Sequence, residues 1–85
     1  MDLKRGTVVV SAAGRDKTHL MVVVNVDENR AEVCDGKERM LNNPKSKNPK
    51  HLIKTEATIN MDLIKTNRAL RKALKEVGKD FKEAN

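Results

Sequence analysis

The sequence contains no tryptophan and no tyrosine, and Phe81 is its one aromatic residue. Modules that read single-stranded RNA stack exposed bases on several aromatic rings, so this class of reader is excluded. The single cysteine, Cys34, cannot form an internal disulfide bond or a zinc site built on several thiolates. No apolar run approaches the roughly 18 residues of a membrane-spanning helix, and the first residues lack the apolar stretch of a signal peptide. We therefore expect a cytoplasmic protein that needs no membrane, metal or cofactor.

Motifs of catalysis are missing as well. Nothing resembles a phosphate-binding glycine loop, a zinc-protease helix or the strained turn of a serine nucleophile. Cys34 with His19 and His51 is the one nucleophile or metal cluster that is conceivable on paper, and an ordinary edge thiol is the favoured explanation of Cys34. We expect that the protein is not an enzyme.

What the chain has in excess is positive charge. Its 85 residues suffice for one small domain and carry 18 Lys and Arg against 12 Asp and Glu, a formal net charge of +6. Such a surplus favours a polyanionic partner. Residues 36–55 hold six basic residues against Glu38 alone, which indicates a contact surface. A second strip of cations recurs at helical spacing, and acidic neighbours make an ordinary solvated face an equal alternative for it. This strip is Arg68, Lys72, Lys75, Lys79 and Lys82.

The first half of the chain is predicted to be β-structure. Runs rich in valine, or alternating with period two, predict five strands, at residues 7–11, 20–26, 30–34, 38–41 and 51–55. Asp35-Gly36 predicts a tight hairpin turn, because this dipeptide tolerates positive φ. Residues 42–50 contain two prolines and three asparagines, so we expect an irregular loop there. Short strands joined by tight turns predict a small antiparallel barrel. Its expected core is Val8, Val10, Leu20, Val22, Val24, Val33, Met40, Leu52 and Ile53.

The C-terminal part changes its apolar period. Leucine, valine and phenylalanine side chains recur on one face of a helix, at Leu63, Leu70, Leu74, Val77 and Phe81. We expect an amphipathic helix over about residues 66–77 that continues through 79–85, with Thr66 or Asn67 as its cap. Gly78 either ends the helix or lies inside it. The predicted organisation is a barrel over residues 1–57 and a helical extension over residues 58–85.

Three segments resemble a known family. Residues 6–17, Gly-Thr-Val-Val-Val-Ser-Ala-Ala-Gly-Arg-Asp-Lys, look like the start of a KOW motif, which is a strand, a basic loop with glycine and a second strand. Together with Asp-Gly-Lys-Glu-Arg at 35–39 and Pro-Lys-Ser-Lys-Asn-Pro-Lys-His-Leu at 44–52, they resemble bacterial KOW-domain RNA-binding proteins. These are related to the large-subunit ribosomal protein of the L-fourteen-e type. The resemblance covers about residues 4–55. One departure is Thr18-His19, where the family usually has a glycine after Gly-Arg-Asp-Lys.

The resemblance implies a mainly β fold, a five-stranded SH3-like barrel that binds structured RNA through its basic loops. The RNA is most often ribosomal, so a role on the ribosome in translation is expected, with a monomer favoured. The expected RNA-binding residues are Arg15, Lys17, Lys37, Arg39, Lys45, Lys47, Lys50 and His51, and Gly14, Asp35 and Gly36 are expected to form turns. Two of these residues have structural alternatives. For Arg39 the alternative is a cross-strand salt bridge with Glu32, and for His51 it is a hydrogen bond to a nearby carbonyl. The alternative function is a protein-interaction module that uses the barrel and the C-terminal helix.

Overall fold

The computed structural model describes residues 3–12 and 19–83, and its elements follow one another as short strands and a final helix. Valine-rich segments form the two central strands, as their β-branched side chains favour. In chain order the elements are β1 (Thr7–Ser11), β2 (Leu20–Val26), β3 (Ala31–Cys34), β4 (Lys45–Lys47), the 3-10 turn η1 (Pro49–His51), β5 (Leu52–Thr58), the 3-10 turn η2 (Met61–Leu63) and α1 (Asn67–Glu83).

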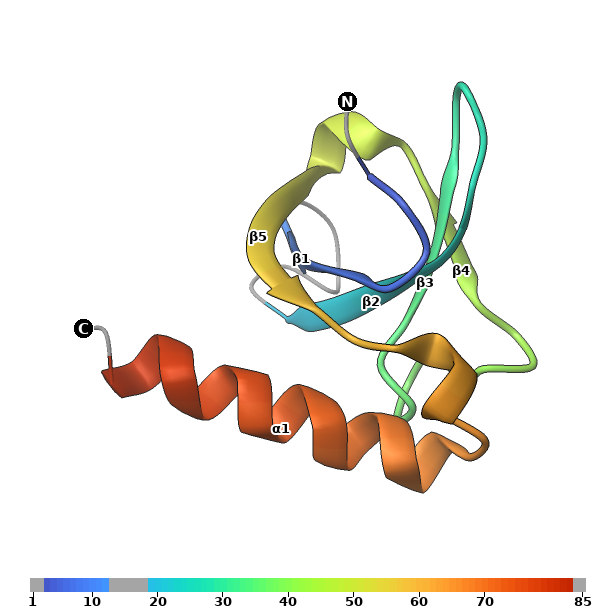
Figure 1. Ribbon diagram of the computed structural model, residues 1–85. Coiled ribbons are helices and arrows are strands. Elements are labelled where there is room, and N and C mark those ends of the chain that lie inside the picture. The colour runs from blue at the N-terminus through green and yellow to red at the C-terminus, as the bar shows by residue number, and fades with distance from the viewer. Residues whose placement is uncertain (1–2, 13–18, 84–85) are drawn as a thin grey trace.

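The strands form one five-stranded antiparallel sheet in the order β4-β3-β2-β1-β5. β5 returns to pair with β1, so that Ser11 lies opposite Leu52. The sheet curls strongly, and η1 carries the chain from one edge strand to the other, while α1 lies across the outside of the curve (Figure 1). Among the described strands, β4 and β5 each pair on one side only, so the sheet is not closed into a hydrogen-bonded ring.

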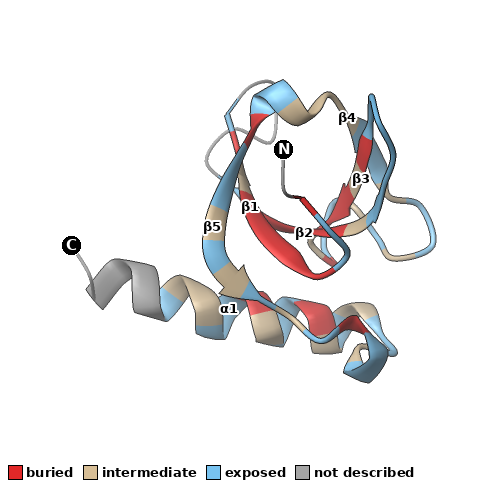
Figure 2. Ribbon diagram, turned by 45° about the horizontal axis from the view of Figure 1, so that its top comes forward, coloured by how far each residue is buried: buried red, intermediate tan, exposed pale blue. Residues whose placement is uncertain are grey.

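Both faces of the central strands are buried. On the inner face, Val9, Met21 and Val23 belong to one cluster, whose other members are Leu3, Ala31, Val33 and Leu52. On the outer face a second cluster lies between the sheet and the C-terminal elements, and it contains Val8, Val22, Cys34, Met61, Leu70 and Leu74. Figure 2 shows this burial on β1, on β2 and on the side of α1 that faces the sheet. A strand covered on both faces needs a continuous apolar run rather than alternation.

The predicted core is therefore correct in part. Four of its members are buried, namely Val8, Val22, Val33 and Leu52. Three more are half-buried, namely Val10, Leu20 and Val24. Met40 and Ile53 were wrong, since they are 38% and 56% exposed. Met40 lies outside any strand. Ile53 lies on the edge strand β5 and is not part of the outer cluster that α1 covers. The prediction missed Val9, Met21 and Val23 because alternation assigns only one face to the core.

The predicted fourth strand at 38–41 was also wrong. The carboxylate of Asp35 accepts hydrogen bonds from the backbone N–H of Lys37 and of Arg39, and the carbonyl of Arg39 accepts from the N–H of Asp35 and of Gly36. These bonds close residues 35–39 into a small loop, so no two-residue hairpin forms. The chain returns to pair with β3 only at Lys45–Lys47, inside the segment expected to be irregular. A 3-10 turn follows there, since the Asn48 side chain accepts from the N–H of Lys50.

The helix begins and ends within the predicted range of residues 66–85, and Gly78 lies inside it rather than at its end. Thr66 caps its start, because the Thr66 hydroxyl accepts from the N–H of Ala69 at 3.0 Å. Leu63, expected on the apolar stripe of the helix, lies instead in η2 and is 74% exposed. A methyl group at Gly78 would contact the Leu20 side chain at 3.4 Å, which shows how closely α1 lies on β2. No helix in the described part of the chain is long and apolar enough to span a membrane.

Candidate nucleic-acid interface

The basic residues of α1 gather on one side of the helix. Leu70 and Leu74 are buried against the sheet. At about 100° per residue, the cations fall within an arc of about 100° that adjoins this buried face. They are Arg68, Arg71, Lys72, Lys75 and Lys79, and all are exposed. Between Asn67 and Lys79 the only acidic residue is Glu76, whose carboxylate lies 3.5 Å from the ammonium of Lys79. The outward side of α1 is therefore a positively charged ridge.

The charge at the beginning of α1 is unfavourable for helix stability. Acidic side chains are favoured in the first turn, where the helix dipole is positive, and cations are favoured in the last. The first turn of α1 has no acidic residue, and Arg68 is its second residue. The cations at the N-terminal half of α1 therefore do not serve to stabilise the helix.

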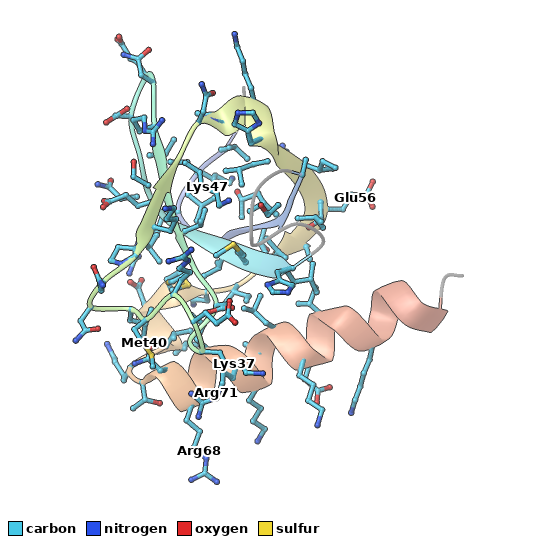
Figure 3. All side chains as sticks on the ribbon, turned by 180° about the vertical axis from the view of Figure 1, so that it is seen from behind. Lys37, Met40, Lys47, Glu56, Arg68 and Arg71 are labelled. Atoms are coloured by element: carbon cyan, nitrogen blue, oxygen red, sulfur yellow. The ribbon has the colours of Figure 1, made fainter. Side chains whose placement is uncertain are left out.

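Lys37 extends this ridge from a different part of the chain. It lies in the small loop after β3 and lines a groove of about 600 Å³ together with Arg71 and Lys75. Figure 3 shows Lys37 beside Arg71 at the surface of α1. His19 lines the same groove, and Asp35 and Glu38 place carboxylates on it; the apolar lining consists of Leu20, Leu74 and Gly78. We call the exposed cations Lys37, Arg68, Arg71, Lys72, Lys75 and Lys79 the α1 basic surface.

Sequence reasoning noted every cation of this surface except Arg71, but only Lys37 was among the expected RNA-binding residues. The strip that it identified follows spacings of four and three through Arg68, Lys72, Lys75 and Lys79. Arg71 stands three residues after Arg68 and four before Lys75, so the same helical spacing could have found it. The side chain of Lys82 lies outside the described residues, as do the predicted contacts Arg15 and Lys17 and the predicted turn at Gly14.

The lysines of β4 face the other way. Lys45 pairs with Val33 and Lys47 with Ala31, and paired residues of an antiparallel sheet share a face. Val33 and Ala31 belong to the inner cluster, so both lysines project on the inner side, away from α1. The ammonium of Lys47 donates to the hydroxyl of buried Ser11 at 3.1 Å (Figure 3). Lys45 is exposed.

Lys50 and His51 lie in η1, on the opposite side of the sheet from α1 (Figure 1). Both are exposed, and Lys50 lines a hollow together with Asp27 and Glu28. The backbone of His51 is held in place, because its N–H donates to Asn48 and its carbonyl accepts from Ala12 at 2.7 Å. The predicted group of basic residues is thus divided between two sides of a molecule that measures 31 × 30 × 23 Å.

Gly36 has the positive φ expected at Asp35-Gly36, at +79°, but within the loop of residues 35–39 rather than in a two-residue hairpin turn. Arg39 follows in the same loop, and its backbone closes that loop on Asp35. Glu32, the alternative partner considered for Arg39, accepts from the side-chain amide of Asn25 at 3.1 Å.

Cys34 is not available for chemistry. It is fully buried in the outer cluster, and its desolvation, with a smaller contribution from the charge of Asp35, raises the pKa of the thiol to about 11. At neutral pH the thiol therefore stays protonated and is a poor nucleophile. His19 and His51 are both exposed. Within residues 3–12 and 19–83, no group of three or more His, Cys, Asp or Glu side chains is placed to hold a metal ion.

Neither a scan against protein-family models nor a search of the curated proteins finds a match to this chain.

Proposed function

We propose that the protein binds structured RNA without catalysis and holds its phosphates on the α1 basic surface. One observation carries this proposal. The helix buries Leu70 and Leu74 on the sheet and turns five cations outward against a single acid, and Lys37 joins them from a separate loop. A surplus that converges from two segments is a local field rather than a general aid to solubility.

The chemistry of this surface suits a phosphate backbone. Lysine and arginine side chains gain affinity by releasing counterions that phosphates had condensed. Arginine also offers a planar pair of donors to phosphate oxygens. With one aromatic residue in the whole sequence, stacking on unpaired bases contributes little, so selectivity rests on helix shape and on 2′-hydroxyl groups. Double-stranded or hairpin RNA is therefore the favoured partner.

The family resemblance supports the same proposal. We infer that the curled five-stranded sheet is an SH3-like barrel of the KOW type, and the return of β5 to β1 after a meander is consistent with it. A KOW protein of this kind would act on ribosomal RNA, as a cytoplasmic monomer that takes part in translation. The helix lies outside the segments that resemble the family, so its basic surface is an addition to the basic loops.

The alternative, a protein-interaction module that docks through its helix, loses its main support. An amphipathic helix docks on a partner through its apolar face. The apolar face of α1 already covers the outer cluster of its own sheet, where Leu70 is fully buried. What α1 offers outward is charge, which suits a polyanion better than an apolar groove.

The test is a titration of labelled hairpin RNA at several salt concentrations, with a polyglutamate chain as a competitor. If about four of the six cations contact phosphates, log affinity should fall with log salt with a slope of roughly −3 to −4. Polyglutamate of equal charge should compete weakly, because it lacks the A-form shape. A slope near zero, or equal competition by polyglutamate, would contradict RNA binding and favour an acidic protein partner.

A further inference from the structure

The β3–β4 segment that carries Lys37 is fastened to the beginning of α1 at two points, one on each side of Lys37. At one end, Gly36 lies against the helix so closely that a Cβ atom there would come within 2.5 Å of the carbonyl oxygen of Asn67 and 3.2 Å of the Cγ of Arg71. Only glycine fits this approach, and the φ of +79° requires glycine for a separate reason. The backbone of the loop therefore touches the helix directly.

Two side chains of α1 hold this contact. The guanidinium of Arg71 donates from Nη1 to the carbonyl of Gly36 at 2.7 Å. The Asn67 side-chain oxygen accepts from the backbone N–H of Leu41 at 2.8 Å, on the other side of Lys37 in the chain. Asn67 and Arg71 are four residues apart, so they lie one above the other on the helix. Both bonds are partly buried and join segments at least 26 residues apart in the sequence.

We propose that Asn67 and Arg71 are positioning residues, which clamp the β3–β4 loop to α1 so that Lys37 and Lys75 form one rigid surface for an RNA backbone. This inference rests on the proposed function. A loop that is free must be ordered when it binds, at a cost of about 0.5–1.5 kcal/mol for each immobilised side chain, and a clamped loop avoids that cost. Asn67 carries no charge, so its contribution to affinity comes from where it holds Lys37.

A double-mutant cycle on the full chain tests this role. Asn67→Ala, Lys37→Ala and the double variant are titrated with one labelled hairpin RNA. We expect Asn67→Ala to weaken binding about 2- to 10-fold in the wild-type background, the range that corresponds to one freed side chain. In the Lys37→Ala background it should have almost no effect, because the lysine that it positions is gone.

Thr66→Ala is the matched control. Thr66 precedes Asn67 and caps the same helix, where its side-chain hydroxyl accepts from the backbone N–H of Ala69. Thr66→Ala should lower the stability of the protein. Any effect that it has on RNA binding should be the same with Lys37 present or replaced by alanine.

Amide hydrogen exchange at Leu41 measures, without RNA, how firmly Asn67 holds the loop. The N–H of Leu41 should exchange at least tenfold faster in Asn67→Ala than in the wild type, and as slowly as wild type in Thr66→Ala when both are compared at equal global stability. An equal effect of Asn67→Ala in both cycle backgrounds, or unchanged exchange at Leu41, would overturn the positioning role. A wild-type chain that binds no RNA would instead overturn the proposed function itself.

Discussion

Removing the side chain of Leu70 should separate the helix from the sheet. Leu70 is fully buried in the outer cluster, between α1 and the strands that carry Val8, Val22 and Cys34. Leu70→Ala deletes three carbon atoms, worth about 2.4 kcal/mol at roughly 0.8 kcal/mol each. The cavity left behind adds to this loss, because the surrounding atoms close it only in part. We expect the free energy of unfolding to fall by about 3 kcal/mol.

Leu63→Ala is the internal control for this substitution. It removes the same three carbons from a side chain that is 74% exposed in η2. It should change the free energy of unfolding by less than about 0.5 kcal/mol. Urea unfolding is followed by far-UV circular dichroism, because the chain has neither tryptophan nor tyrosine for fluorescence.

Reaction of Cys34 with a thiol reagent gives a second measure of the separation of α1 from the sheet. Cys34 is the one thiol of the chain and lies beneath α1. Its reaction with an aromatic disulfide should accelerate at least tenfold in Leu70→Ala and stay at the wild-type rate in Leu63→Ala. Equal stability losses in the two variants, or a Cys34 that reacts rapidly in the wild type, would refute the packing of α1 on the sheet.

Three further predictions concern the cap, the loop and the buried thiol. Thr66→Ala should lower the free energy of unfolding by about 1 kcal/mol in the same urea assay, since the N–H of Ala69 loses its acceptor. Gly36→Ala should cost at least about 2 kcal/mol, because alanine is strained at a φ of +79° and its methyl group meets the carbonyl of Asn67; an unchanged midpoint would contradict the close approach. The raised pKa of Cys34 favours the folded state fully below the ordinary value near 9, and that contribution is lost as pH rises towards 11. Stability should therefore fall more steeply between pH 9 and 11 in the wild type than in Cys34→Ala, and parallel curves would contradict it.

The local signals of the sequence located most of the elements. β1 and β2 fall where the valine runs predict strands, and β3 begins one residue later than predicted, at Ala31. The change of apolar period identified α1, and Thr66 is one of the two caps considered for it. Such features depend on neighbours in the chain, so the sequence alone carries them.

The fourth strand could not be predicted, because β4 consists of Lys-Ser-Lys and has no apolar residue. Its place in the sheet comes from backbone bonds to β3, and charged side chains are common on such edge strands. The prediction relied on Asp35-Gly36 and assumed a two-residue turn. The Asp35 carboxylate instead binds two N–H groups of the loop, which only the folded backbone reveals.

The choice of buried face and the placement of charge also need the third dimension. The sequence shows that valines run through β2, but only the fold shows that both faces are buried: Val22 lies in the outer cluster that α1 covers, and Val23 lies in the inner cluster of the curled sheet. The same packing brings Lys37 to Lys75, which are 38 positions apart in the sequence. The concentration of charge in residues 36–55 was real, yet the fold divides its members between two sides of the sheet.

The most direct test of RNA binding by the α1 basic surface compares two triple variants of equal net charge. One changes Arg68, Lys72 and Lys75 to alanine, all exposed on α1. The other changes the three exposed lysines of β4, η1 and β5 to alanine, which are Lys45, Lys50 and Lys54. Each variant removes three charges from a formal net charge of +6.

Both variants are titrated with the same hairpin RNA at several salt concentrations. The α1 triple variant should lose about 2 to 3 units from the slope of log affinity against log salt, because each phosphate contact contributes about 0.7 to 0.9. The second variant should lose less than about one unit. Equal losses would show that binding follows only net charge, and a larger loss in the Lys45, Lys50 and Lys54 variant would move the RNA to the opposite side of the sheet and contradict the account.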